Sequence, residues 1–206
     1  MPTILKRCLL VRHGQTQGNL ERRYMGRRSN EPLSPEGVAA LINLRQEYFE
    51  VRRPARVFAS PAMRCVESAN VLVPEYEIKT VEGLQEIDFG DFEGMRAQEL
   101  EELPEYRAWI DSNGKLPFPN GESREDFVKR VSDAFKSTLA TFEETDLSSL
   151  FVVHGGTIMA IMSAFSDHDY FEFQVAPATG CDALFEVCGD DLRLLAFSRL
   201  DVRVYA

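Results

Sequence analysis

The sequence contains no long apolar run, and no stretch of its 206 residues approaches the roughly 18 apolar residues of a membrane-spanning helix. Lys6 and Arg7 interrupt the N-terminus before the apolar core of a signal peptide could form. A CxxC spacing is also absent, so we expect the four cysteines to be reduced and partly buried. These absences predict a cytoplasmic protein without a membrane partner.

Positive charge is scarce, since 23 Lys and Arg residues face 33 Asp and Glu residues and the formal net charge is -10. Nucleic acids and anionic membranes bind clustered positive charge, so we expect neither as a partner. Residues 1–28 are the exception, because they hold seven basic residues and a single acid. Such a short basic segment on an acidic protein predicts a local binding site for an anion.

No internal repeat, low-complexity tract or linker divides the chain, so we expect a single domain over residues 1–206. Short apolar runs alternate with longer amphipathic segments. This pattern predicts an α/β fold of three layers, with a mainly parallel central sheet and helices on both faces. The predicted strands are residues 8–11, 56–59, 76–80, 150–153, 183–187 and 192–197, and the last two form a closing pair joined by the turn 189–191.

Helix starts are recognisable in the segments between these strands. Ser34 followed by Pro35 has the pattern of an N-cap and a first-turn proline, and it predicts a helix to about residue 50. Ser60 and Pro61 repeat the pattern before residues 63–73. We therefore expect a second helix that begins at Pro61.

Residues 123–143 carry apolar side chains at helical spacing and predict a long amphipathic helix. The preceding residues 83–120 are rich in Gly, Pro, Glu and aromatic residues. We expect them to form an irregular excursion with short helices, of the kind that makes a lid or one wall of a pocket.

Polar side chains stand at or just past the carboxyl ends of the predicted strands, where an open parallel sheet binds its ligands. These side chains are Arg12, His13, Arg64, Glu86 and His154. His13 and His154 each follow an apolar strand and precede a glycine, whereas His168 lies in a polar stretch and is expected to be structural or superficial. Arg64, one turn inside its helix, can reach back to the edge and bind two oxygens.

Glycines accompany both histidines and favour a bound phosphate. Gly14 allows the backbone to approach a ligand closely. Residues 153–157 lead into a helix, whose free N–H groups and positive dipole end favour an anion. The sequence therefore predicts a phosphate site at this edge.

The sequence lacks the motifs of three other kinds of enzyme. Residues 88–90 spell a kinase tripeptide, but no glycine-rich nucleotide loop accompanies it. A metal hydrolase using His13 and His154 would lack the HxxxH and HxH spacings, and the neighbouring arginines would repel a divalent cation. A Ser-His-Asp hydrolase would need a GxSxG turn, which is missing.

Five ordered motifs resemble the histidine phosphatase superfamily, which also contains the cofactor-dependent phosphoglycerate mutases. The resemblance spans nearly the whole chain. The motifs are Arg12-His13-Gly14 with Thr16 and Asn19, residues 33–37, residues 60–64, residues 84–90 with 92–94, and residues 153–156.

The resemblance implies that His13 is the nucleophile and that Glu86 is the proton donor. It also implies that Arg12, Arg64 and His154 bind the phosphoryl oxygens, without a metal or a cofactor. The residues that would line the substrate pocket are Thr16, Asn19, Gln15 and Gly155. The physical logic agrees, because two arginines and a histidine can stabilise the equatorial oxygens of a phosphoryl group in transfer.

The two reacting side chains need opposite pKa shifts. His13 must be unprotonated to attack, and we expect the surrounding cations to lower its pKa. Glu86 must hold a proton for the departing alkoxide, so we expect partial burial or nearby carboxylates to raise its pKa. The carboxylates close in sequence are Glu82, Asp88 and Glu93, which are also the alternative donors.

The predicted function is a metal-independent phosphomonoesterase that hydrolyses a small phosphorylated metabolite through a phosphohistidine on His13. A mutase is the alternative, although 206 residues are few for one and residues 83–120 show no extra substrate-binding insertion. A catalytically silent binding module is a second alternative, disfavoured because all five core positions carry competent residues.

The substrate itself is left open among small phosphate esters. Residues 119–123 and 180–183 resemble the branch with alpha-ribazole phosphatases, and sugar-phosphate and glycerate-phosphate phosphatases share these features. The arginines of residues 20–30 suggest a second anionic group on the substrate; they are Arg22, Arg23, Arg27 and Arg28. A homodimer formed through an edge strand or helix is a further expectation.

Overall fold

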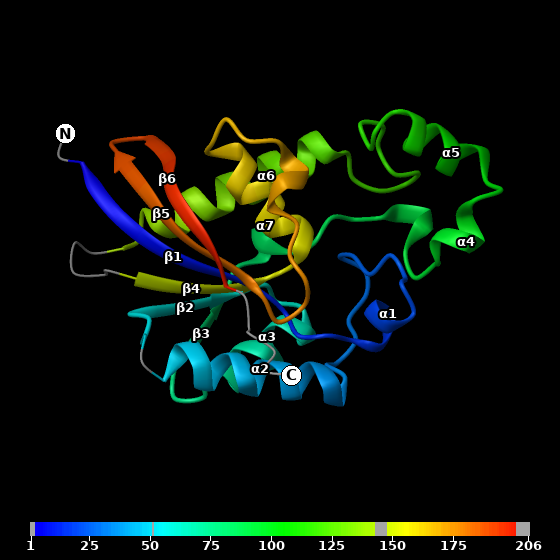
Figure 1. Ribbon diagram of the computed structural model, residues 1–206. Coiled ribbons are helices and arrows are strands. Elements are labelled where there is room, and N and C mark those ends of the chain that lie inside the picture. Colours follow the sequence, from blue (N-terminus) through cyan, green and yellow to red (C-terminus); the bar gives the residue numbers. More distant parts are fainter. Residues whose placement is uncertain (1–2, 51, 143–147, 201–206) are drawn as a thin grey trace.

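The computed structural model describes residues 3–50, 52–142 and 148–200. Within these residues, six strands form one sheet in the order β3-β2-β4-β1-β5-β6 (Figure 1). The strands are β1 (Ile4–Arg12), β2 (Arg56–Ala59), β3 (Ile78–Thr80), β4 (Ser148–Val153), β5 (Gly180–Cys188) and β6 (Asp191–Leu200). The first four strands in this order, β3 to β1, run parallel to one another. β5 is antiparallel to both of its neighbours, β1 and β6. The prediction of a mainly parallel α/β sheet is confirmed.

The sheet separates two hydrophobic cores. Successive residues of β1 alternate between them, so that Leu10 packs into the core beneath α6 (Arg124–Leu139) and α7 (Gly155–Ala164). Leu9 packs into the core beneath α2 (Pro35–Leu44) and α3 (Met63–Leu72). A strand covered on both faces is apolar along its length, which explains the continuous run in β1. The helices on both faces complete the three layers (Figure 1).

The start of α2 agrees with the prediction, but the start of α3 does not. The Ser34 hydroxyl accepts a hydrogen bond from the Gly37 N–H at 3.1 Å, with Pro35 as the first helical residue. A π-helical segment (Arg45–Phe49) continues α2 close to its predicted end. α3 has Ala62 as its N-cap and begins at Met63, while the Ser60 hydroxyl accepts from the Ala62 N–H at 3.4 Å and bonds His154 at 2.8 Å. The expectation of a helix beginning at Pro61 is therefore wrong.

The helix predicted over residues 123–143 is shorter in the structure. α6 is capped by Ser123 and ends at Leu139. Phe142 continues the apolar pattern for a tertiary reason, since its ring stacks on Phe58 with centroids 5.5 Å apart. Residue 143 lies outside the described residues.

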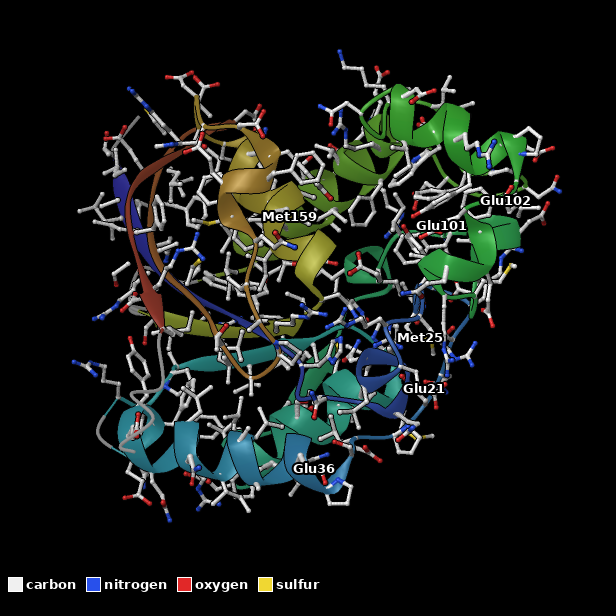
Figure 2. The ribbon with its side chains drawn as sticks, turned by 45° about the vertical axis from the view of Figure 1, so that its right-hand side comes forward. Glu21, Met25, Glu36, Glu101, Glu102 and Met159 are labelled. Carbon is white, nitrogen blue, oxygen red and sulfur yellow. The ribbon has the colours of Figure 1, made fainter. Side chains whose placement is uncertain are left out.

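Residues 83–120 form the expected irregular excursion, which includes α4 (Ala97–Leu100) and α5 (Pro104–Asp111). The excursion packs against the chain around α1 (Gln17–Leu20), and Figure 2 shows Glu21 and Met25 of that chain below Glu101 and Glu102 of the excursion. The Tyr24 N–H donates to the Met95 carbonyl at 2.9 Å. 3-10 turns lie at the start of the excursion (Glu82–Leu84), within it (Gly90–Phe92) and after α7 (Tyr170–Phe173).

Two further expectations concern the described residues as a whole. None of their helices combines the length and the apolar character that crossing a bilayer requires. Their cysteines are free thiols, with Cys8, Cys65 and Cys181 buried and Cys188 exposed.

Two leucines of β1 provide a matched test of the core. Leu10 is 0% exposed and Leu5 is 52% exposed. We expect Leu10→Ala to lower the free energy of unfolding by about 2–5 kcal/mol through lost burial and a cavity. Leu5→Ala should cost about 1 kcal/mol or less, because its side chain is already half in water. Urea unfolding at fixed pH measures both, and equal losses would contradict the two-core arrangement.

Candidate active site

The carboxyl ends of the parallel strands bring the predicted site residues together. Arg12 ends β1, and it pairs with Val153, which ends β4. His13 and His154 follow directly, and their rings meet edge to face with centroids 5.3 Å apart. Arg64 comes from α3, which follows β2, and Glu86 comes from the loop after β3. The strand order β3-β2-β4-β1 thus explains the meeting of these five residues.

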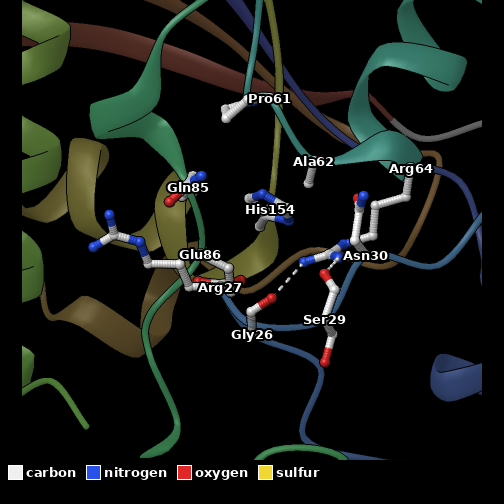
Figure 3. A pocket seen from close by; sticks show the side chains of 10 residues that line it. All are labelled: Gly26, Arg27, Ser29, Asn30, Pro61, Ala62, Arg64, Gln85, Glu86 and His154. Carbon is white, nitrogen blue, oxygen red and sulfur yellow. Dashed lines mark hydrogen bonds between the residues drawn. The ribbon is translucent and has the colours of Figure 1, made fainter.

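A cavity of about 240 Å³ opens at this edge (Figure 3). It is lined by Gly26, Arg27, Ser29, Asn30, Pro61, Ala62, Arg64, Gln85, Glu86 and His154. His13 and Arg12 are not among the lining residues, but the ring of His13 contacts that of His154, and Arg12 interacts electrostatically with Glu86 and Arg64. The first residues of the 83–120 excursion therefore contribute to the wall, while a lid role for the rest stays a prediction.

His13 is held as a neutral base. It is 4% exposed, and its Nδ1 lies 2.7 Å from the Gly14 carbonyl oxygen. A carbonyl oxygen can only accept, so Nδ1 carries the proton and Nε2 is left with a free lone pair. Burial lowers the pKa of His13 well below its usual value, and the charges of Arg64 and Arg12 lower it further. The sequence argument named the cations, but burial is the larger cause.

Arg64 is fixed by backbone carbonyls rather than by carboxylates. It is 1% exposed, and its guanidinium donates to the carbonyls of Ser29 at 2.8 Å and Gly26 at 3.1 Å. Arg64 is the second residue of α3, not one turn inside it as the sequence suggested. A salt bridge with Glu67 is not its role, because that carboxylate accepts from the Leu33 N–H at 2.8 Å.

Arg12 supplies the second guanidinium and is partly buried. Its Nη1 donates to the Val175 carbonyl at 2.8 Å. Within the described residues, Nε of Arg12 and Nε of Arg64 are buried and have no hydrogen-bond partner. Buried guanidinium donors that the protein leaves unsatisfied suit a multivalent oxyanion, such as a phosphoryl group.

His154 is positioned by polar side chains behind it. Its Nε2 lies 2.8 Å from the Ser60 hydroxyl, and Cys65 Sγ contacts both ring nitrogens at 3.6 and 3.7 Å. Burial lowers the pKa of His154 well below its usual value, and nearby Arg64 adds to the effect. The imidazole therefore enters the site neutral and can contribute a hydrogen bond without a charge.

Glu86 is a buried carboxyl group between two backbone donors. The N–H groups of Ile87 and Gly156 each donate to one of its oxygens at 3.0 Å. Burial raises the pKa of Glu86 and outweighs the opposing effect of these bonds and of the arginines. A Cβ on Gly156 would lie 2.3 Å from Glu86 Oε1, so this position requires glycine. The carboxyl group can therefore remain protonated and act as an acid.

The neighbouring carboxylates do not raise the pKa of Glu86, and this part of the sequence argument is corrected. Asp88 pairs with Arg28 at 2.8 Å. Glu93 accepts from the Gly26 N–H at 2.8 Å, and Glu82 accepts from Gln85 at 3.2 Å. Each of the alternative donors is thus engaged by another partner, whereas Glu86 faces the cavity.

The other predicted substrate contacts lie at the border of the site. Thr16 and Asn19 bond each other in a capping box at the start of α1. Neither they nor Gln15 nor Gly155 is among the lining residues of the cavity, so their contacts with substrate stay a prediction. Packing also requires glycine at position 14, because a Cβ would lie 2.7 Å from Leu41, and its approach to a ligand stays a prediction.

Arg130 of α6 is a supporting residue that the sequence argument missed. It donates to the carbonyls of Gly83 at 2.9 Å and Glu86 at 3.3 Å. Its guanidinium also binds Glu122 through two bonds of 2.9 and 2.8 Å, and Glu122 accepts from the Asp88 N–H at 3.3 Å. This network fixes the loop that carries Glu86. The feature that could have indicated this role is that Arg130, a charged residue, lies beside Phe127 on the apolar face of the helix.

Comparison with known proteins identifies the family. The sequence model of the histidine phosphatase superfamily (branch 1) matches residues 8–196. A Hydrogenobacter thermophilus protein provisionally named phosphoserine phosphatase 2 is 29% identical over 162 residues, which are 77% of each chain. A Cytophaga hutchinsonii protein named 2,3-bisphosphoglycerate-dependent phosphoglycerate mutase is 27% identical over an alignment of 207 residues, which covers 93% of each chain.

A solved structure shares the fold. The alpha-ribazole phosphatase of Shigella flexneri superposes with a TM-score of 0.79 at 23% identity, covering 97% of this chain and 98% of that one. At this identity the likeness concerns the architecture, which agrees with the sheet order and the layers described above.

The Arg130 network should be measurable as stability. The side chains of Arg130 and Glu122 are 21% and 14% exposed, so Arg130→Met leaves a mostly buried carboxylate without its partner. We expect a loss of about 2–4 kcal/mol in unfolding free energy. Lys129→Met is the matched control, because its ion pair with Asp133 is exposed and should contribute about 0.5 kcal/mol or less. Comparable losses in the two variants would refute the supporting role of Arg130.

Proposed function

We propose that this chain, which belongs to branch 1 of the histidine phosphatase superfamily, is a metal-independent phosphomonoesterase that carries the phosphoryl group on His13. The chain is a phosphatase enzyme by its family. The observation that carries the mechanism is the state of His13, a buried neutral imidazole whose Nδ1 is bonded to the Gly14 carbonyl. Its unprotonated Nε2 is the nucleophile.

The first step forms a phosphoenzyme. Nε2 of His13 attacks phosphorus, the bond to the ester oxygen breaks, and Glu86 transfers its proton to the departing alkoxide. Arg12, Arg64 and His154 stabilise the equatorial oxygens during transfer. The Gly14 carbonyl stabilises the ring of His13, which becomes positively charged when phosphorylated on Nε2.

The second step returns the enzyme to its starting state. Glu86 is now a carboxylate and takes a proton from water as the water oxygen attacks phosphorus. The bond between phosphorus and Nε2 breaks, and inorganic phosphate leaves. Glu86 thus alternates between acid and base, and its raised pKa favours the protonated form that the first step needs.

A mutase would use the same first step and return the phosphoryl group to another hydroxyl. The expectation that chain length separates the two functions is not supported, because the mutase-named relative is covered over 93% of its length. The phosphatase is favoured by the relative provisionally named phosphoserine phosphatase 2, while the cavity of about 240 Å³ is of a size for a small ester in either function.

The substrate we propose is a small phosphorylated metabolite of the cytoplasm. Alpha-ribazole phosphate and sugar or glycerate phosphates stand as candidates from residues 119–123 and 180–183. The names of the relatives differ in substrate, so a panel is required.

Phosphate release in the presence of EDTA tests the proposal. The panel contains p-nitrophenyl phosphate, 3-phosphoglycerate, glycerol 3-phosphate, sugar phosphates, phosphoserine and alpha-ribazole phosphate. We expect release by the wild type and a loss of at least about a thousandfold in His13→Ala. His168→Ala is the control, because this histidine is exposed and pairs with Glu172. Full release by His13→Ala would overturn the mechanism, and interconversion of phosphoglycerates without release would establish the mutase.

The pKa shifts fix the direction of the pH profile. Because its pKa is lowered, His13 stays neutral at pH values somewhat below 6.5. The acid limb of the kcat/KM profile should therefore lie below pH 6.5. The profile is first corrected for the second ionisation of the substrate, near about pH 6. Because its pKa is raised, Glu86 stays protonated at pH values somewhat above 4.5, and its loss of the proton sets the alkaline limb of the profile. Glu86→Gln should lower kcat and abolish that limb. If the alkaline limb persists in Glu86→Gln, the proton given to the leaving alkoxide comes from another group.

A further inference from the structure

Two of the four arginines in residues 20–30 are engaged in holding the fold. Arg23 pairs with Glu21 at 2.8 Å and donates to the Gly94 carbonyl at 2.7 Å. Arg28 pairs with Asp88 at 2.8 Å. These guanidiniums fasten the basic segment to the excursion, so they are not available to a substrate.

Arg27 differs from its neighbours because it lines the cavity. Within the described residues, its guanidinium has no hydrogen bond and no ion pair, and the side chain is exposed. Arg22 is likewise exposed, but it is not among the lining residues. Of the arginines that suggested a second anionic group, Arg27 is therefore the one in position to contact it.

The backbone fixes Arg27 on the side of the proton donor. Its N–H donates to the Ile87 carbonyl at 3.1 Å, and Ile87 directly follows Glu86. The preceding Gly26 bonds Glu93 through its N–H and Arg64 through its carbonyl. Figure 3 shows Arg27 beside Glu86 and Gln85, extending away from Arg64. The side chain thus borders the place of the leaving alcohol rather than that of the phosphoryl group.

We infer that Arg27 binds an anionic substituent, a carboxylate or a second phosphate, on the alcohol part of the substrate. This inference rests on the proposed function, since Glu86 marks the leaving alcohol only if it is the proton donor. A guanidinium offers paired donors that match either oxyanion. Within the described part of the chain Arg27 forms no ion pair, because Asp88 pairs with Arg28 and Oε1 of Glu93 accepts from the Gly26 N–H and the Ser29 hydroxyl.

A pair of substrates that differ at one carbon tests the inference. 3-Phosphoglycerate carries a carboxylate where glycerol 3-phosphate carries a hydroxymethyl group. We expect wild-type kcat/KM to favour the carboxylate by roughly 10- to 100-fold, as for one charge-assisted contact. Arg27→Gln should reduce this ratio to near one, mainly through a higher KM for 3-phosphoglycerate. The case of a second phosphate is tested in the same way, by comparing fructose 1,6-bisphosphate with fructose 6-phosphate.

Arg22→Gln is the matched control, because it removes the same charge from the same segment but outside the cavity. A ratio that falls equally in both variants would assign the preference to the general field of the segment and would overturn the inference. A wild type that hydrolyses both substrates without preference would overturn it as well, while leaving the proposed function intact.

Binding to His13→Ala separates the inference from catalysis. Calorimetry with 3-phosphoglycerate and glycerol 3-phosphate should show the same preference, and adding Arg27→Gln should abolish it. Selective binding without hydrolysis in the wild type would sustain the role of Arg27 and refute the phosphatase. Equal binding of both compounds before and after the substitution would refute the role of Arg27.

Discussion

The structure depends on burying ionisable side chains at one edge of the sheet. His13, Arg64, Glu86 and His154 are each at least nine-tenths buried, in an environment where an uncompensated charge is costly. Burial lowers the pKa of both imidazoles and raises the pKa of the carboxyl group, so it favours the neutral form of each. The same desolvation therefore favours the protonation states that the proposed phosphoryl transfer requires.

Backbone groups rather than opposite charges satisfy this site. The Gly14 carbonyl accepts from His13, and carbonyls of residues 26 and 29 accept from Arg64. Glu86 in turn accepts from two N–H groups. Backbone partners leave no internal anion to neutralise the guanidiniums, whose positive field remains directed at a ligand. Because these partners are backbone groups, the positions of the site residues depend on the geometry of the loops. Arg130 of α6 fixes one of these loops by a hydrogen bond to the Glu86 carbonyl.

The N-terminal basic segment has two roles that its composition does not separate. Arg23, through the Gly94 carbonyl, and Arg28, through Asp88, connect it to the 83–120 excursion, whereas Arg27 reaches the cavity. Because the excursion also supplies Gln85 and Glu86, these contacts couple the wall of the cavity to the segment that holds Arg64. The wall of the cavity is thus assembled from parts of the chain that meet only in the folded protein.

The sequence by itself determined the six strands in outline, the starts of α2 and α6 and the meeting of five polar side chains at one edge of the sheet. It did so because apolar alternation reports burial, and because polar residues that directly follow strands must share one edge of a parallel sheet. The tertiary structure alone decided the partner of Ser60, the early end of α6 and the roles of Arg27 and Arg130. These depend on contacts between residues distant in sequence: a hydroxyl or a guanidinium bonds whichever group folding brings within about 3 Å of it, and local patterns carry no record of that.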